Sequence, residues 1–198
     1  ISMLGFAALT GQFGNVLADV QAPAQPVGLA TPLAVDKQSV DLPGTVAITP
    51  DEGLALVASG LKIDPADPTK QVDDNRVIVV DLKANPPQVI ATLVSGARPT
   101  GISITPDGKY ALVANRGEGS VSVFSINGRQ VTKTDTVKVG DARSGPVQAA
   151  ITPDGKNALV TRDGDSRVSV LAIDNGKVEY TKRDMRSGIQ PYHITMNP

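Results

Sequence analysis

Three copies of one turn, a regular spacing between them and strand-like alternation together predict an all-β fold, a β-propeller of four-stranded antiparallel blades. The turn reads Ile-Thr-Pro-Asp and begins at Ile48, Ile104 and Ile151. A glycine follows directly in the second and third copies, and after Glu52 in the first. Counting a fourth, partial copy at the chain end, the turn prolines Pro50, Pro106, Pro153 and Pro198 are 56, 47 and 45 residues apart. Periods of this length match one propeller blade.

Each unit is expected to form four strands in chain order. The expected ranges are 45–49, 54–59, 76–82 and 88–94 in the first unit, 101–105, 110–115, 120–126 and 130–139 in the second, and 147–152, 157–162, 167–173 and 177–185 in the third. Apolar residues recur at alternate positions, as at Val121 and Val123, which is the period of a pleated strand. Asn127-Gly128 and Asn175-Gly176 favour tight type I′ turns. The segment 60–75 is interpreted as a loop inserted between the second and third strands of the first unit.

The chain divides into an N-terminal segment, 1–41, and propeller repeats, 42–198. The blades are predicted at about 42–97, 98–144 and 145–189, with a partial blade at 190–198. The first 18 residues carry no charge, and a Pro/Ala-rich linker follows them. Because Val16-Leu17-Ala18 has the small residues that a signal peptidase prefers, a signal-peptide remnant and a strand of a preceding blade both stay open for this segment.

Composition excludes several classes of function. Lys and Arg number 19 against 20 Asp and Glu, giving a net charge of −1, so a nucleic-acid partner is not expected. The absence of cysteine excludes disulfides, thiolate metal sites and a cysteine nucleophile. No stretch approaches the roughly 20 apolar residues of a membrane-spanning helix.

The second strand of each unit carries a family resemblance. Tyr110-Ala-Leu-Val-Ala-Asn115, with variants at 55–59 and 158–162, resembles the YVTN-type β-propeller repeat family, which includes phosphogluconolactonase-like and surface-layer-type propellers. The resemblance covers 42–198 and implies a ring of about seven blades in an exported bacterial protein, periplasmic or extracellular. Three blades plus one inner strand do not close such a ring. The chain is therefore either a fragment or one half of a ring closed by self-association of two copies.

Candidate site residues lie on one face of the predicted disc. Consecutive antiparallel strands place the tight turns on one face, and the second-to-third-strand loops and the inter-blade links on the other, where binding residues tend to lie. The candidates on that loop face are Arg98, Arg116, Arg143, Arg162, Gln190, Tyr192 and His193. Arginine suits carboxylate and phosphate ligands. His193, the only histidine, is a candidate catalytic base, and a structural role is its alternative.

No metal and no cofactor is predicted. The aspartates in 60–75, together with Asp163 and Asp165, lack the spacing of an EF-hand. The sequence also lacks a phosphate loop, a zincin motif, a dinucleotide fingerprint and a nucleophile elbow.

These observations favour a noncatalytic binding or scaffold propeller that presents its loop face to a small ligand or a protein partner. The alternative, implied by the resemblance, is a lactonase-type hydrolase in which His193 and an arginine act on a lactone carbonyl. A third alternative, a subunit of a redox complex, requires a partner that bears the cofactor. Whether the protein is an enzyme stays open at this level.

Overall fold

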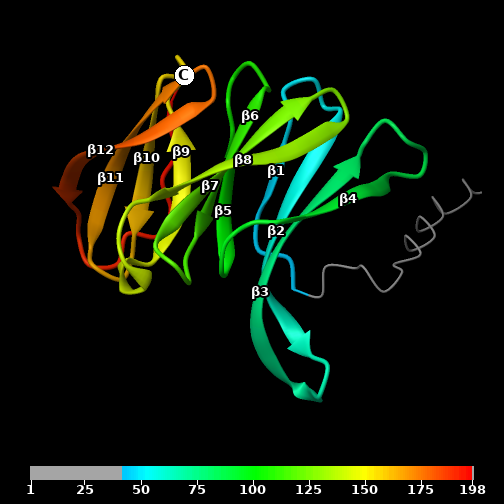
Figure 1. Cartoon of the computed structure of the whole chain (residues 1–198), viewed down its shortest axis with the longest axis horizontal. Helices are drawn as coiled ribbons and strands as arrows, with labels where there is room; N and C mark the ends of the chain where they lie inside the picture. Colours follow the sequence, from blue (N-terminus) through cyan, green and yellow to red (C-terminus); the bar gives the residue numbers. More distant parts are fainter. Residues whose placement is uncertain (1–41, 198) are drawn as a thin grey trace, which may run out of the picture. The chain divides into compact units, whose positions relative to one another are not determined.

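The computed structural model describes residues 42–197, which form three four-stranded antiparallel sheets (Figure 1). The first sheet contains β1 (Val46–Ile48), β2 (Leu54–Asp64), β3 (Asp67–Asp81) and β4 (Gln88–Val94). The second contains β5 (Pro99–Ile104), β6 (Tyr110–Asn115), β7 (Ser120–Asn127) and β8 (Gln130–Lys138). The third contains β9 (Pro146–Ile151), β10 (Asn157–Arg162), β11 (Arg167–Asp174) and β12 (Lys177–Arg186), and the short 3₁₀ helix η1 (Ala142–Ser144) precedes it.

Within each sheet the strands are hydrogen-bonded in chain order, which is the blade topology of a β-propeller. β1, β5 and β9 are the first strands of their blades, and they lie next to one another across the blade boundaries. Strands β6 and β10 begin and end at the residues that the sequence predicts. The predicted fold class is therefore confirmed.

The repeated turn is stabilised by its own side chains. In the second blade the Asp107 carboxylate accepts hydrogen bonds from Thr105 Oγ1 at 2.6 Å and from the Lys109 backbone N–H at 3.1 Å. The bond from Thr105, followed by that from the Lys109 N–H, lowers the pKa of Asp107. Gly108 closes the turn with a φ of +73°, a conformation that glycine adopts without steric cost. The same arrangement recurs in the third blade around Asp154.

Strand alternation divides the core into two clusters, one at each blade boundary. Leu112 and Val123 of the second blade belong to the cluster shared with the third blade, while Val113 and Phe124 belong to the cluster shared with the first. Successive residues of a strand point to opposite faces, so the two middle strands of the second blade, β6 and β7, contribute to both clusters. The three blades are thereby joined by continuous apolar packing.

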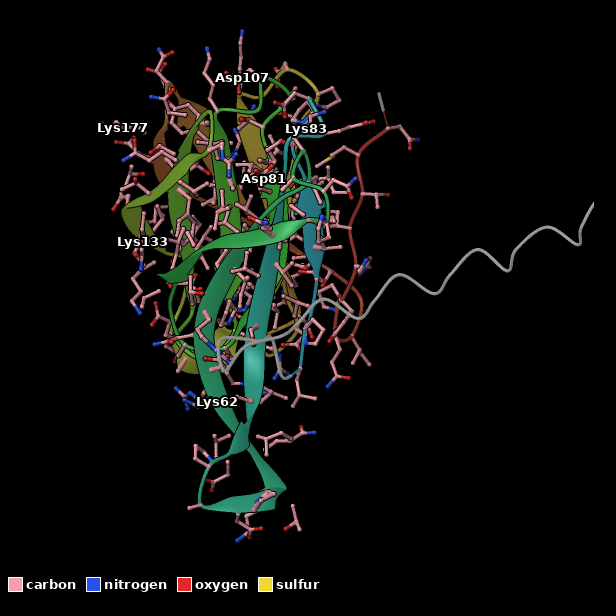
Figure 2. All side chains as sticks on the ribbon, turned by 90° about the vertical axis from the view of Figure 1, so that its right-hand side faces the viewer. Lys62, Asp81, Lys83, Asp107, Lys133 and Lys177 are labelled. Atoms are coloured by element: carbon pink, nitrogen blue, oxygen red, sulfur yellow. The ribbon has the colours of Figure 1, made fainter. Side chains whose placement is uncertain are left out.

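The insertion at 60–75 corrects the sequence interpretation, because it is a β-hairpin and not a loop. β2 and β3 continue through it, pairing Leu61 with Asp73 and Ile63 with Gln71 after a bulge near Gly60. We call this extension the arm. It projects beyond the rest of the first blade, with Lys62 near its base, at the opposite end of the blades from Asp107 and Lys83 (Figures 1 and 2).

Residues 191–197 also differ from expectation. In the described part of the chain they take no part in a β-ladder, although a fourth inner strand was expected there. Instead the carbonyl oxygen of Tyr192 accepts a 3.1 Å hydrogen bond from Thr161 Oγ1. The interpretations placed on 1–41 lie outside the described residues. Among residues 42–197 we find no helix with the length and apolar character to cross a membrane.

Candidate functional site

A cavity of about 400 Å³ opens where the first strands of the blades begin. Its polar lining comes from all three blades and from the chain after them: Thr45, Arg98, Thr100, Gln148, Tyr192 and His193. Its apolar lining includes Leu42, Leu61, Pro99 and Val147. A concave, largely apolar site with a few convergent polar groups is the usual form of a small-molecule site.

The backbones that line the cavity approach one another very closely. A Cβ atom built on Gly101 would lie 2.6 Å from Gln148 Cα and closer still to the Val147 carbonyl oxygen, so only glycine fits there. Thr100 Oγ1 donates a 2.9 Å hydrogen bond to the same Val147 oxygen. Thr45 Oγ1 donates in the same way to the Thr100 carbonyl of the next blade. These threonine bridges fix the spacing of the cavity wall.

Arg98 stands at the rim of the cavity in a left-handed conformation. Its φ is +52°, its backbone N–H donates to the Asp74 carbonyl at 3.0 Å, and its own carbonyl accepts from Arg116 N–H at 2.9 Å. The same place, just before the proline that opens the blade, is occupied by Gly145 with φ +58° in the third blade and by Gln190 with φ +52° after it. A left-handed non-glycine residue costs about 1–3 kcal/mol. Arg98 therefore occupies a position that glycine fills without that cost.

The link that leads to Arg98 is held by side chains of the second blade. Asn115 Oδ1 accepts hydrogen bonds from Ser95 Oγ at 2.7 Å and from Gly96 N–H at 3.0 Å, and Glu118 Oε2 accepts from Ala97 N–H at 3.2 Å. Burial acts to raise the pKa of Glu118, but the hydrogen bonds it accepts, first from Ser120 and then from Ala97, outweigh burial and lower it. The carboxylate form of Glu118 thus helps to place Arg98.

The arm forms part of the cavity wall and carries the ion-pair partner of Arg98. Gly60 and Leu61, at its base, line the cavity. Asp73 Oδ1 lies 3.3 Å from Arg98 Nε, and the two side chains are 61% and 36% exposed, respectively. The neighbouring carboxylate of Asp74 is buried and does not line the cavity.

Asp74 serves the blade instead of the cavity. Its Oδ2 accepts from Ser59 Oγ at 2.8 Å and from Arg76 Nε at 2.7 Å. Burial acts to raise the pKa of Asp74, yet the hydrogen bonds from Ser59, Arg76 and the Asn75 N–H lower it on balance.

Of the seven sequence-predicted site residues, the cavity brings together Arg98, Tyr192 and His193. Arg116 instead pairs with Asp163 at 2.7 Å. Arg162 is buried in the third blade, where it pairs with Asp165 and with Asp184. These two arginines stabilise blades and do not line the cavity.

Arg143 and Gln190 also lie outside the cavity lining. Arg143 lies in η1, is 93% exposed and pairs with Asp141 at 3.1 Å. Gln190 is exposed, and its backbone N–H donates to Ser166 Oγ at 3.4 Å.

Sequence reasoning missed Thr45, Thr100 and Gln148 as lining residues. A signal was present, because Thr45 and Gln148 occupy the repeat position of His193. Within residues 42–197, no group of three or more His, Cys, Asp or Glu side chains is placed to hold a metal ion. The arm aspartates have other partners, for example Lys70 at 2.8 Å from Asp67.

Comparison with protein families and solved structures agrees with the β-propeller fold of the three sheets. A family model described as lactonase, 7-bladed beta-propeller, matches residues 74–195, more than half of the chain. A hydrazine synthase from Kuenenia stuttgartiensis is 26% identical with a TM-score of 0.60, covering 81% of this chain and 39% of its own. No curated protein matches the sequence.

Two further solved structures share the fold at lower identity. A candidate 6-phosphogluconolactonase from Bacteroides uniformis has a TM-score of 0.66 at 17% identity, covering 79% of this chain and 44% of its own. The periplasmic gluconolactonase of Pseudomonas aeruginosa has a TM-score of 0.59 at 18% identity, covering 75% and 42%. This chain thus spans less than half the length of these three solved chains.

Proposed function

The chain belongs to the lactonase family of seven-bladed β-propellers, and from this we propose that its cavity binds a sugar lactone and hydrolyses it. The observation that carries the proposal is the convergence of Arg98, Tyr192 and His193 on one cavity from segments far apart in the sequence. The structures of a candidate 6-phosphogluconolactonase and of a gluconolactonase, which share the fold, are consistent with it.

The lining supplies the groups that lactone hydrolysis needs. Water adds to the lactone carbonyl carbon, the bond from that carbon to the ring oxygen breaks, and the ring oxygen leaves as a hydroxyl group, giving a hydroxy acid. We assign His193 as the base that takes the proton from water and returns it to the ring oxygen. Arg98 donates hydrogen bonds to the carbonyl oxygen as negative charge develops on it. We assign Tyr192 and Gln148, which also line the cavity, to the binding of sugar hydroxyls.

This proposal reverses the order of the sequence-based functions. The sequence favoured a noncatalytic binding or scaffold protein, with a lactonase as the alternative, and the family match supports the alternative better. The YVTN label itself stays a prediction. We also propose a periplasmic or extracellular location, and the Pseudomonas aeruginosa gluconolactonase that shares the fold is described as periplasmic.

The test is hydrolysis of glucono-δ-lactone by the 198-residue chain, followed as acid release above the spontaneous rate. His193→Ala is expected to lower the enzymatic rate about 100-fold or more, because a positioned general base contributes about 10²–10⁴-fold. Because His193 is exposed, the melting temperature of the variant should equal that of the wild type. Arg143→Ala, which removes an exposed arginine away from the cavity, is the matched control and should keep the full rate.

A wild-type rate equal to the spontaneous rate would remove the lactonase proposal. The noncatalytic function would then be the one to pursue, starting with ligand titrations followed by NMR.

A further inference from the structure

The position of Arg98 points to a role for its side chain at the cavity. The left-handed conformation before the blade-opening proline is adopted by Arg98 in the second blade, by Gly145 in the third blade and by Gln190 after it. Of the two side chains that stand there, that of Arg98 lines the cavity. Glycine would satisfy the backbone at Arg98 without strain. The backbone alone does not require a side chain there, so its use has to be sought in what the guanidinium contacts.

Within residues 42–197, the charged neighbour of the guanidinium comes from the arm. Among the described residues, the ion-pair partner of Arg98 is Asp73, through Nε. The pair is part exposed and is made through Nε, and we assign the terminal nitrogens of Arg98 to the ligand. Asp73 lies opposite Leu61 in the β2–β3 ladder, and Leu61 lines the cavity. The arm thus brings a negative charge to the cavity rim beside its arginine.

The charge balance at the rim follows from these contacts. Arg98 and His193 are the cavity-lining side chains that can carry positive charge. Asp73 offsets the positive charge of Arg98, and a phosphate or carboxylate on the ligand would meet both an arginine and a competing carboxylate. A carbonyl or hydroxyl oxygen would still accept hydrogen bonds from Arg98 without that repulsion.

We infer that the arm, through Asp73, makes the cavity select an uncharged lactone over a phosphorylated or carboxylated one. This inference rests on the proposed function for the identity of the ligand, but not for the effect of Asp73 on anions. It makes Asp73 a specificity-determining residue that acts through Arg98.

The experiment measures affinities of the 198-residue chain at pH 8 and low salt by NMR titration. The probes are glucono-δ-lactam, an uncharged and non-hydrolysable lactone analogue, its 6-phosphate, and inorganic phosphate. The variants are Asp73→Asn, Arg98→Gly and the two combined. Asp67→Asn is the matched control, because it removes the same charge from the same arm but its partner is Lys70.

The wild type is expected to bind the lactam more tightly than the lactam 6-phosphate. Asp73→Asn should raise affinity for the 6-phosphate and for inorganic phosphate about two- to fivefold, the range expected of an exposed ion pair. Affinity for the lactam should stay within about twofold. Asp67→Asn should change none of these values, and adding Arg98→Gly should abolish the gain from Asp73→Asn.

An unchanged phosphate affinity in Asp73→Asn, or an equal gain in Asp67→Asn, would overturn the inference. The outcomes for the two proposals are separable. If no variant binds the lactam while Asp73→Asn gains phosphate affinity, the lactonase proposal fails and the role of Asp73 stands. If the wild type hydrolyses lactone but Asp73→Asn gains nothing, the function stands and the inference falls.

Discussion

Gly101→Ala tests the close approach of the first strands around which the cavity is built. A Cβ atom at this position would lie 2.6 Å from Gln148 Cα, and real Cβ contacts stay beyond 3.0 Å. β5 and β9 must therefore move apart by several tenths of an ångström. Overpacking of this kind costs about 1–3 kcal/mol, and loss of the Thr100–Val147 hydrogen bond adds about 1 kcal/mol.

The expected destabilisation by Gly101→Ala is thus about 2–4 kcal/mol. At about 2–4 °C per kcal/mol for a domain of this size, the melting temperature should fall by roughly 4–16 °C. Thermal unfolding followed by circular dichroism measures the shift. Gly188→Ala is the matched control, because nothing lies within 4 Å of a Cβ placed there. A melting temperature for Gly101→Ala within about 1 °C of the control would refute the close approach of the strands.

Three further predictions concern stability. Arg116→Ala removes the partner of the buried Asp163 carboxylate. It should lower the free energy of unfolding in urea by about 2–3 kcal/mol and leave lactam affinity unchanged. A loss of lactam binding without a loss of stability would contradict the structural role of Arg116. Phe124→Ala, in the core cluster between the first two blades, should cost about 3–5 kcal/mol in the same assay, and a cost below about 1 kcal/mol would argue against this packing. The folded-state pKa of Asp74 is lowered. Its contribution to the free energy of unfolding is therefore present above the unfolded pKa, about 3.9, and is lost as pH falls through the folded-state pKa. Asp74→Asn should therefore destabilise the protein at pH 7, and its difference from the wild type should shrink below about pH 4; a difference that stays constant with pH would contradict the lowered pKa.

Much of the fold could be predicted because blade structure is local. The Thr-Pro-Asp-Gly turn is closed by its own hydrogen bonds, as at Asp107, and strand alternation sets the two faces of each blade. These features lie within a few residues of one another in the chain. For this reason the bounds of β6 and β10 agree with the prediction to the residue.

The strands of the arm were not predicted from the sequence, for a physical reason. The segment 60–75 contains two prolines and several aspartates, which are typical of loops. Yet Leu61 pairs with Asp73 and Ile63 with Gln71, because the ladder of β2 and β3 already holds the two segments side by side. Strand formation there depends on that pairing more than on local preference.

The sequence by itself determined that the chain repeats a four-stranded unit, which face carries the longer links, and that His193 occupies a position near the cavity. Only the tertiary structure decided which arginine accompanies it. Arg98 and Arg116 look alike in the sequence, but Asp163, 47 residues away, pairs with Arg116 and withdraws it from any ligand. Arg98 is left at the cavity rim with Asp73 of the arm beside it. Such choices depend on which charges the packed blades bring within a few ångströms of each other, and no local pattern in the chain encodes those distances.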